Sequence, residues 1–355
     1  MTTITSQDYI ITFNTESYNA LNNFLEKSNY SKLFFLVDTN THNYCLPRFL
    51  SQINTKKEIE IIEIEAGEVH KNIETCSGVW NALSELNADR KSLLINVGGG
   101  VVTDLGGFVA STFKRGIDFI NVPTSLLAMV DASIGGKTGV DLGSLKNQIG
   151  VINTPQMVLV DTQFLDTLPQ RELRSGLAEM LKHGLIHNEL YWSKLNDLSK
   201  LKLEDLDNLI YESIVIKKDI VEQDPKENNL RKTLNFGHTI GHAIESYYLS
   251  HEDQPSLLHG EAIAIGMILA THISTEMIGF PELKNTFVKS AIKSIYGHVD
   301  IPEKDYAPII NLLKYDKKNE HGNINFVLLE DIGKPKINCK VDNSLIIKAF
   351  NFYRE

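Results

Sequence analysis

The chain has few cysteines and no excess of positive charge. Its 355 residues include three cysteines, Cys45, Cys76 and Cys339, an odd number at wide spacing. This pattern predicts a reducing compartment without a disulfide framework, and no Cys-x-x-Cys pair points to thiolate metal binding. The formal net charge of −10 argues against nucleic acid as a general partner, because nothing supplies a basic face to neutralise phosphates.

The sequence also lacks an obvious export signal and a long apolar run. The start, MTTITSQDYI, has neither a basic region nor an apolar region. The most apolar window, Ala262 to Ile273, is too short to span a bilayer. We therefore expect a cytoplasmic protein that does not attach to a membrane.

The length exceeds the usual size of a single domain, so two domains are expected. Strands and helical patterns such as Asn72–Asn87 alternate in the first half, which predicts a mostly parallel sheet covered on both faces. We place this α/β domain at residues 1–168. The expected strands are Tyr9–Phe13, Leu33–Val37, Ile59–Ile64, Leu93–Val97, Phe119–Val122 and Met157–Val160.

The second half changes character at Pro169, a residue suited to the first turn of a helix. We expect an all-α domain at residues 169–355, with one late hairpin of Ile324–Leu329 and Lys336–Cys339 around Gly333. The expected helices are Arg171–His187, Glu204–Val221, Asn235–Tyr248, Leu258–Met277 and Glu282–Tyr296.

A glycine-rich stretch follows the fourth predicted strand. Gly98-x-Gly100-x-x-Thr103 has Thr at the third glycine position, so the simple dinucleotide fingerprint is absent. The glycines either form a tight turn or bring backbone N–H groups against a phosphate. Further on, Asp131, Gly135-Gly136-Lys137-Thr138 and Lys146-Asn147 have the composition of a loop that closes over an anionic substrate.

Acids near the first-half turns allow two interpretations. Asp38 ends a predicted strand, where it can hold ribose hydroxyls or cap a helix. Asp104 follows the glycines and is a candidate N-cap of the next helix. Glu68 and Lys71 lie beside a predicted turn, and by themselves they are weak evidence of a binding site.

The second half contains the metal candidates. Glu179 and Lys182 are three residues apart and therefore share a helix face. They form either an ion pair on the surface or part of a buried site. His238 and His242 have the i, i+4 spacing of a zinc pair but lack the intervening glutamate of a metalloprotease. His259 opens another helix, and two histidines with one glutamate suit a Lewis-acidic zinc ion.

Several cations lie near these groups in an acidic chain, which indicates a small, multiply charged anion such as a molecule with a phosphate and a carboxylate. They include Arg115, Lys217, Arg231 and Lys317.

Longer motifs carry a resemblance over nearly the whole chain, from Asp38 to the segment 316–319. They read GGGVVTDLGGFVAS, KRG, VPTSLLAMVDASIGGKTGVD, LKNQIG, LPQRELRSGLAEMLKHG, LNFGHTIGHAIE and LLHGEAIAIGM. The chain resembles the 3-dehydroquinate synthase family of sugar phosphate cyclases. The resemblance implies a Rossmann-like domain, a helical domain, an active site in the cleft between them, and a homodimer in which Arg115 reaches the neighbour's phosphate.

The resemblance implies three sets of residues. Contacts to NAD come from Asp38, Asn40, Glu68, Lys71, Gly99, Gly100, Val101, Asp104, Thr124, Ser125, Lys137, Lys146, Phe164, Leu165 and Thr167. A divalent zinc or cobalt ion is bound by Glu179, His238 and His259, which moves His242 to the substrate pocket. That pocket contains Asp131, Lys137, Lys146, Asn147, Lys182, Lys217, Arg231, Asn235, His242, Arg115 and Lys317, with Lys318 as the alternative to Lys317.

The implied reaction converts 3-deoxy-D-arabino-heptulosonate 7-phosphate into 3-dehydroquinate and phosphate. It combines transient oxidation by NAD, elimination of phosphate, reduction and aldol closure. Three alternatives remain: another cyclase such as 2-deoxy-scyllo-inosose synthase, a metal alcohol dehydrogenase like glycerol dehydrogenase, and a silent nucleotide-binding module. Departures from the family pattern are small, namely Ser125 for Thr, Ala132 for Ser, and a longer loop at Ser250–Ser256.

Overall fold

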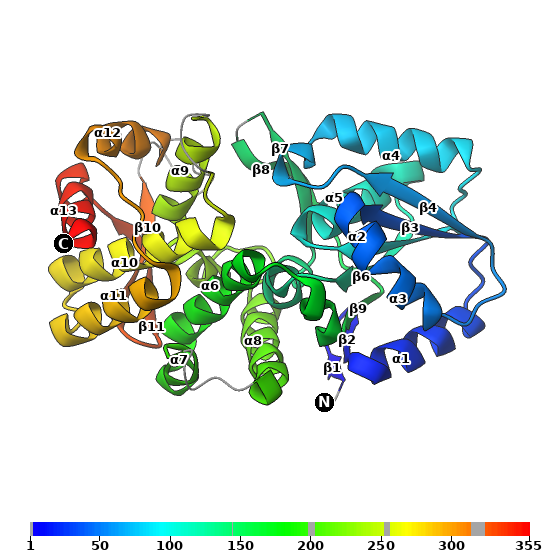
Figure 1. Cartoon of the computed structure of the whole chain (residues 1–355), viewed down its shortest axis with the longest axis horizontal. Coiled ribbons are helices and arrows are strands. Elements are labelled where there is room, and N and C mark those ends of the chain that lie inside the picture. Colours follow the sequence, from blue (N-terminus) through cyan, green and yellow to red (C-terminus); the bar gives the residue numbers. More distant parts are fainter. Residues whose placement is uncertain (1–2, 144, 198–202, 252–255, 314–323) are drawn as a thin grey trace. The chain divides into compact units, whose positions relative to one another are not determined.

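The chain separates into two compact units, residues 1–173 and 174–355. The computed structural model describes residues 3–143, 145–197, 203–251, 256–313 and 324–355 (Figure 1). The division falls within helix α6 (Gln170–His187), whereas the sequence placed it after Leu168. Helix α6 begins directly after Pro169, whose carbonyl accepts the N–H of Leu173.

Unit 1 is built on a mostly parallel sheet, as the strand pattern predicted, and the sheet has a seventh strand, β1, beyond the six that were expected. Its strand neighbours are parallel except for the β1–β2 pair. The central strands are buried because helices cover both faces of the sheet (Figure 1). In spatial order the strands are β1 (Ile4–Thr5), β2 (Ile10–Phe13), β9 (Met157–Val160), β6 (Asp118–Pro123), β5 (Leu93–Gly98), β3 (Leu33–Asp38) and β4 (Ile59–Ile64).

The helices of unit 1 connect these strands. Helices α4 and α5 share one apolar core with strands β3 to β6, which includes Phe34, Leu94 and Leu105. The α-helices are α1 (Asn14–Lys27), α2 (Thr39–Tyr44), α3 (Leu46–Ser51), α4 (Ile73–Glu85) and α5 (Gly100–Thr112). Single turns occur at η1 (Glu68–His70), η2 (Phe113–Arg115), η3 (Ala128–Ala132) and η4 (Thr162–Thr167).

The stretch predicted as a flexible loop is instead an antiparallel hairpin of β7 (Lys137–Leu142) and β8 (Leu145–Ile152). Gly139 and Gly150 lie opposite each other in this hairpin. A Cβ atom on Gly139 would lie 2.4 Å from the carbonyl oxygen of Ile149. These two glycines therefore permit close strand pairing, a role that the composition did not reveal.

Unit 2 is helical and carries the predicted hairpin, with Gly333 at its turn in a left-handed conformation (φ +80°). The hairpin strands are β10 (Asn325–Asp331) and β11 (Lys334–Lys340). The helices are α7 (Glu189–Leu195), α8 (Leu203–Gln223), η6 (Leu230–Asn235), α9 (His238–Leu249), α10 (His259–Ile278), α11 (Glu282–Tyr296), α12 (Glu303–Leu312) and α13 (Asn343–Arg354).

Helix α10 is the central helix of this unit. At 20 residues it is longer than the predicted apolar window, and within the described residues it is the one helix long and apolar enough to cross a membrane. The argument from length was therefore wrong. However, 67% of its most apolar window is buried, because α9, α11, α13 and β10 pack against it. Burial in the protein core accounts for its apolar composition.

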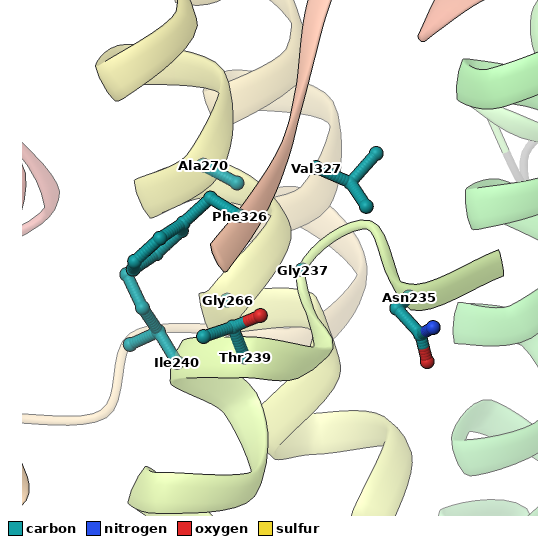
Figure 2. A pocket seen from close by; sticks show the side chains of 8 residues that line it. All are labelled: Asn235, Gly237, Thr239, Ile240, Gly266, Ala270, Phe326 and Val327. Carbon is teal, nitrogen blue, oxygen red and sulfur yellow. The ribbon is translucent and has the colours of Figure 1, made fainter. Parts of the chain in front are cut away.

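Glycines allow α9 and α10 to approach closely. A Cβ atom on Gly266 in α10 would lie 2.1 Å from the carbonyl oxygen of Gly237, the residue that precedes α9. A Cβ atom on Gly241 would lie 2.7 Å from Ile263. Figure 2 shows Gly237 and Gly266 facing each other, with Phe326 and Ile240 nearby. The hollow among these residues does not admit a water molecule, so it is a packing contact rather than a ligand site.

We predict that Gly266→Ala lowers the free energy of unfolding by about 1–3 kcal/mol, because the added methyl group must push two backbones apart. Gly78→Ala in α4 is the control. Nothing lies within 4 Å of its added Cβ atom, so helix propensity gives a neutral result or a gain of about 0.5–1 kcal/mol. Urea unfolding followed by far-UV circular dichroism measures both changes, and equal stability of the two variants would contradict the packing argument.

Candidate functional site

The predicted nucleotide contacts in unit 1 lie at the carboxyl ends of parallel strands. Strand β4 lies outside β3, whereas β5 pairs with the other side of β3, so the strand order reverses between β3 and β5. Asp38 ends β3, and Gly98 ends β5. Open parallel sheets bind ligands at such a reversal point, which supports the assignment of these residues to a nucleotide site.

Asp38 caps a helix, as one interpretation proposed. Its Oδ1 accepts the N–H of Thr41 at 2.7 Å, and the hydroxyl of Thr41 accepts the N–H of Asp38 at 2.9 Å. Since this reciprocal arrangement uses one carboxylate oxygen, Oδ2 is available for a second role. Asn40, in the first turn of α2, is exposed.

The glycine turn leads directly into α5. Gly99 is the N-cap residue, and a Cβ atom on Gly98 would lie 2.5 Å from the Val102 side chain. Asp104 lies inside α5, so its interpretation as a helix cap was wrong. The other predicted nucleotide contacts lie at this turn or follow strands β6 and β9. Two of them are buried, Thr124 and Phe164. The half-buried ones are Gly100, Val101, Ser125 and Leu165, and Thr167 is exposed.

Residues from four elements of unit 1 form one cluster of charges. The ammonium of Lys71 donates to Asp104 Oδ2 at 2.6 Å and to Asn147 Oδ1 at 2.7 Å. Lys146 donates to Glu68 Oε1 at 2.6 Å and lies 3.6 Å from Asp141 Oδ2. The structure thus joins predicted nucleotide contacts with predicted substrate contacts, and it adds Asp141, which the sequence analysis missed.

Burial and pairing act in opposite directions on these groups. Burial disfavours the charged form of Lys71, but Asp104 and Glu68 outweigh it and raise the pKa of the ammonium. Burial raises the pKa of Asp104 and of Asp141 against the effect of the two lysines. Lys71 therefore stays charged, and the cluster pairs its two lysines with three carboxylates.

Strained backbone accompanies other predicted residues of unit 1. Lys114 and Arg115 have positive φ values of +48° and +70°, and Asn147 has +50°. Asp131 lies in the single π-helical turn η3, a form that is frequent at functional sites. Lys137 and Arg115 are exposed.

In unit 2 the predicted metal ligands converge. Glu179 comes from α6, His238 begins α9, and His259 begins α10. Glu179 Oε1 lies 3.4 Å from His238 Nε2 and 3.7 Å from His259 Nε2. His242 belongs to the same group, because ring nitrogens of His238, His242 and His259 lie within 4.8 Å of one another. His242 therefore lies beside the two histidines that face the carboxylate of Glu179.

The electrostatics of this cluster favour a cation. Glu179 is fully buried and pairs with the equally buried Lys182, so these residues do not form a surface pair. Burial opposes ionisation, yet Lys182 and the two histidines hold the pKa of Glu179 well below its usual range. Burial and Lys182 lower the pKa of His238, whereas Glu245 and Glu179 overcome burial and raise the pKa of His259 to about 10.

The donor set fits a divalent metal. Glu179 Oε1 is a buried oxygen without a hydrogen-bond partner, which is costly unless another group binds it. Tetrahedral zinc bonds of 2.0–2.2 Å place neighbouring ligand atoms roughly 3.3–3.5 Å apart. The distances from Glu179 Oε1 to the two Nε2 atoms are close to this range. One carboxylate and two imidazoles also leave a coordination position for substrate.

Buried cations and amides of unit 2 complete the predicted set. Lys182, Lys217 and Arg231 are 1%, 6% and 2% exposed, so each is far more buried than a surface cation. Arg231 donates to the carbonyl of Pro225 at 2.9 Å, and Asn235 donates to Glu227 Oε1 at 2.7 Å. Lys317 and Lys318 lie outside the described residues.

The sequence analysis assigned no role to Glu245, whose Oε2 lies 3.1 Å from His259 Nδ1. It lies seven residues after His238 and three after His242. The helical spacing i, i+4, i+7 places these three residues on one face of α9. Extending the histidine pair by one helical turn would have found this carboxylate.

Comparison with known sequences identifies relatives over almost the whole chain. The family profile of the 3-dehydroquinate synthase N-terminal domain matches residues 61–175, and that of the 3-dehydroquinate synthase C-terminal domain matches residues 176–319. A 3-dehydroquinate synthase from Parabacteroides distasonis is 44% identical over 94% of this chain and 95% of its own length. One from Streptococcus pyogenes is 40% identical over 97% and 96%.

Solved structures share the fold. A 2-deoxy-scyllo-inosose synthase complexed with carbaglucose-6-phosphate, NAD⁺ and Co²⁺ has a TM-score of 0.87 and 26% identity, covering 99% of both chains. The 2-epi-5-epi-valiolone synthase of Streptomyces hygroscopicus, with NAD⁺ and Zn²⁺ bound, has a TM-score of 0.86 at 24% identity, covering 100% of this chain and 99% of its own. A probable glycerol dehydrogenase from Sinorhizobium meliloti has the same fold at 15% identity and a TM-score of 0.61, covering 97% of both chains.

We predict that Glu179→Ala abolishes stoichiometric zinc binding, because it removes the one carboxylate that faces both Nε2 atoms. Metal content after dialysis, measured by atomic emission, should fall from about one ion per chain to near zero. Glu276→Ala, an exposed carboxylate on α10, should bind zinc like the unaltered protein. Full zinc occupancy of Glu179→Ala would exclude this residue as a ligand.

Proposed function

The chain belongs to the 3-dehydroquinate synthase family, and we propose on that ground that it converts 3-deoxy-D-arabino-heptulosonate 7-phosphate into 3-dehydroquinate and phosphate. It is thus a carbon–oxygen lyase that eliminates phosphate and closes a ring, and it serves the shikimate pathway. The structural observation that best supports the proposal is the cluster of Glu179, His238 and His259, in which a buried carboxylate oxygen faces two imidazoles.

These three residues would hold the divalent cation, zinc or cobalt, which supplies a Lewis acid for the carbinol oxygen of the substrate. Glu179 contributes the negative charge, because Lys182 and the histidines keep it ionised despite its burial. Lys182 itself lies beside this carboxylate and adds a fixed positive charge next to the bound anion. Its burial means that the surrounding protein screens this charge less than bulk water would.

Unit 1 would hold NAD at the carboxyl ends of β3 and β5. The nucleotide supplies a transient oxidation that is reversed in the same turnover, so none is consumed. We assign the ribose hydroxyls to Asp38 at the end of β3, and the phosphates to the backbone N–H groups of the turn at Gly98–Gly100. Glu68, Lys71 and Asp104 border the same edge through their hydrogen-bonded cluster with Lys146 and Asn147.

Substrate recognition divides between phosphate and sugar acid. We assign the phosphate to Lys137, Lys146, Asn147 and Arg115. Charge contacts that strengthen in the transition state are worth roughly 2–4 kcal/mol each. The carboxylate and hydroxyls are assigned to Asp131, Lys182, Lys217, Arg231, Asn235, His242 and Lys317. The family's homodimer and a cytoplasmic location complete the proposal, with unit 1 as the nucleotide-binding domain and unit 2 as the metal-binding domain.

We predict that the purified protein releases phosphate from the heptulosonate substrate with NAD⁺ at catalytic concentration, and that a chelator stops the release. Steady NADH accumulation at 340 nm would instead favour a dehydrogenase. NAD binding without phosphate release at any metal concentration would indicate a silent nucleotide-binding module. Turnover of glucose 6-phosphate, but not of the heptulosonate, would indicate the 2-deoxy-scyllo-inosose synthase alternative.

We predict that Lys146→Ala lowers kcat/KM for phosphate release by at least about tenfold, because a phosphate-directed ammonium is lost. Lys194→Ala is the matched control, since Lys194 pairs with Glu212 at 2.7 Å on an exposed surface. Steady-state kinetics of both variants under identical zinc and NAD⁺ loading make the comparison. An unchanged kcat/KM for Lys146→Ala would remove this residue from the phosphate site.

A further inference from the structure

We propose that Glu245 is a positioning residue of the metal site, which accepts the Nδ1 proton of His259 and thereby presents Nε2 to the cation. The inference rests on the proposed metal-dependent function, because it takes His259 as a ligand. It gives a role to Glu245, the last residue of the motif LNFGHTIGHAIE, which the sequence analysis left without one and which the ligand set does not contain.

The geometry around the imidazole carries the proposal. Glu245 Oε2 lies 3.1 Å from His259 Nδ1, while Nε2 on the opposite edge of the ring lies 3.7 Å from Glu179 Oε1. A neutral imidazole carries one proton, so a proton on Nδ1 leaves the Nε2 lone pair free for a metal. Glu245 therefore selects the tautomer that binds on the side of Glu179.

Burial makes this contact a constraint on the ring rather than a surface pair. Glu245 is 7% exposed on the well-packed helix α9, and a carboxylate in that position must be compensated by donors. His259 is the first residue of α10, where its backbone is fixed as well. The N–H of the next residue, Gly260, donates to Ser175 Oγ at 3.0 Å, and Glu261 caps the N–H of Leu258 at 2.8 Å.

His238 shows the same arrangement with a different acceptor. Its Nδ1 lies 3.2 Å from the carbonyl oxygen of Phe236, and its Nε2 faces Glu179. Both rings are thus oriented through Nδ1 and directed to the same carboxylate through Nε2. A backbone carbonyl orients without charge, whereas the Glu245 carboxylate also increases the basicity of the His259 ring. We infer that His259 is the more strongly donating of the two imidazoles.

The test compares zinc affinity in Glu245→Leu, Glu245→Gln and Glu276→Gln, measured by competition with a chromophoric chelator. We expect Glu245→Leu to bind zinc roughly 10- to 100-fold more weakly than the unaltered protein. Glu245→Gln should lose less, because its amide oxygen still accepts the Nδ1 proton but carries no charge. Glu276→Gln removes an exposed charge from α10 and should bind zinc normally.

A second measurement tests whether His259 binds zinc through Nε2, which the positioning role requires. Long-range ¹⁵N–¹H correlation spectra of the zinc-loaded, unaltered protein should show the His259 proton on Nδ1, with the resonance assigned by its loss in His259→Gln. Far-UV circular dichroism of the metal-free variants checks the fold. If Glu245→Leu does not fold, then Glu245→Gln and the tautomer of the unaltered protein still decide the question.

The outcomes distinguish this inference from the proposed function. Unchanged zinc affinity in a folded Glu245→Leu protein, or a proton on Nε2 of His259, would overturn the positioning role even if phosphate release is intact. Failure of the unaltered protein to bind zinc would instead overturn the metal-dependent function and this inference with it. Weakened zinc binding in Glu245→Leu with no phosphate release by the unaltered protein would leave the positioning role standing and refute the cyclase assignment.

Discussion

The close approach of three helix backbones in unit 2 is the constraint on which the candidate metal site depends. A Cβ atom on Gly260 would lie 2.1 Å from the carbonyl oxygen of Ser175, so α10 touches α6 directly. Gly260 follows His259, and Ser175 precedes Glu179 by about one turn on α6. Gly237 and Gly266 bring α9 and α10 equally close, next to His238. Backbone contacts, rather than flexible side chains, therefore fix the separation of the three ligands.

These backbone contacts keep the charged carboxylate of Glu179 buried. In a less tightly packed site, the surrounding groups would shift to reduce the free-energy cost of that burial. Glu179 Oε1 has no hydrogen-bond partner, although the carboxylate is ionised and fully buried. Such an oxygen would ordinarily be reached by water or a shifted donor. Here helix packing prevents collapse onto it, and a cation at the proposed metal site would satisfy it. The arrangement sacrifices stability for a site that needs little rearrangement on binding.

Periodic patterns in the sequence predicted most of the fold. The predicted ends of strands and helices were most accurate where a single periodic pattern dominates the segment. Strands Ile59–Ile64 and Met157–Val160 and helix Glu282–Tyr296 begin and end as expected. The β7–β8 hairpin was missed, because its glycines and polar residues are typical of turns, while their pairing depends on contacts across the two strands. The interpretation of Asp104 as a cap failed because α5 begins several residues earlier, at the glycine turn.

The candidate site was less predictable from local spacing. The i, i+4 rule identified His238 with His242, whereas the place of His259 came from family resemblance, since its proximity arises from the packing of two separate helices. Glu245 was missed although it extends the same helical face. Its partner lies on another helix, and no spacing rule reports such a pair.

Lys146 has a further consequence for how any anion binds. Its ammonium already contacts Glu68 at 2.6 Å and approaches Asp141 at 3.6 Å. An incoming phosphate therefore competes with two resident carboxylates and gains only the difference between the old and the new ion pair. At the phosphate site proposed above, binding to this lysine would therefore be an exchange of counter-ions.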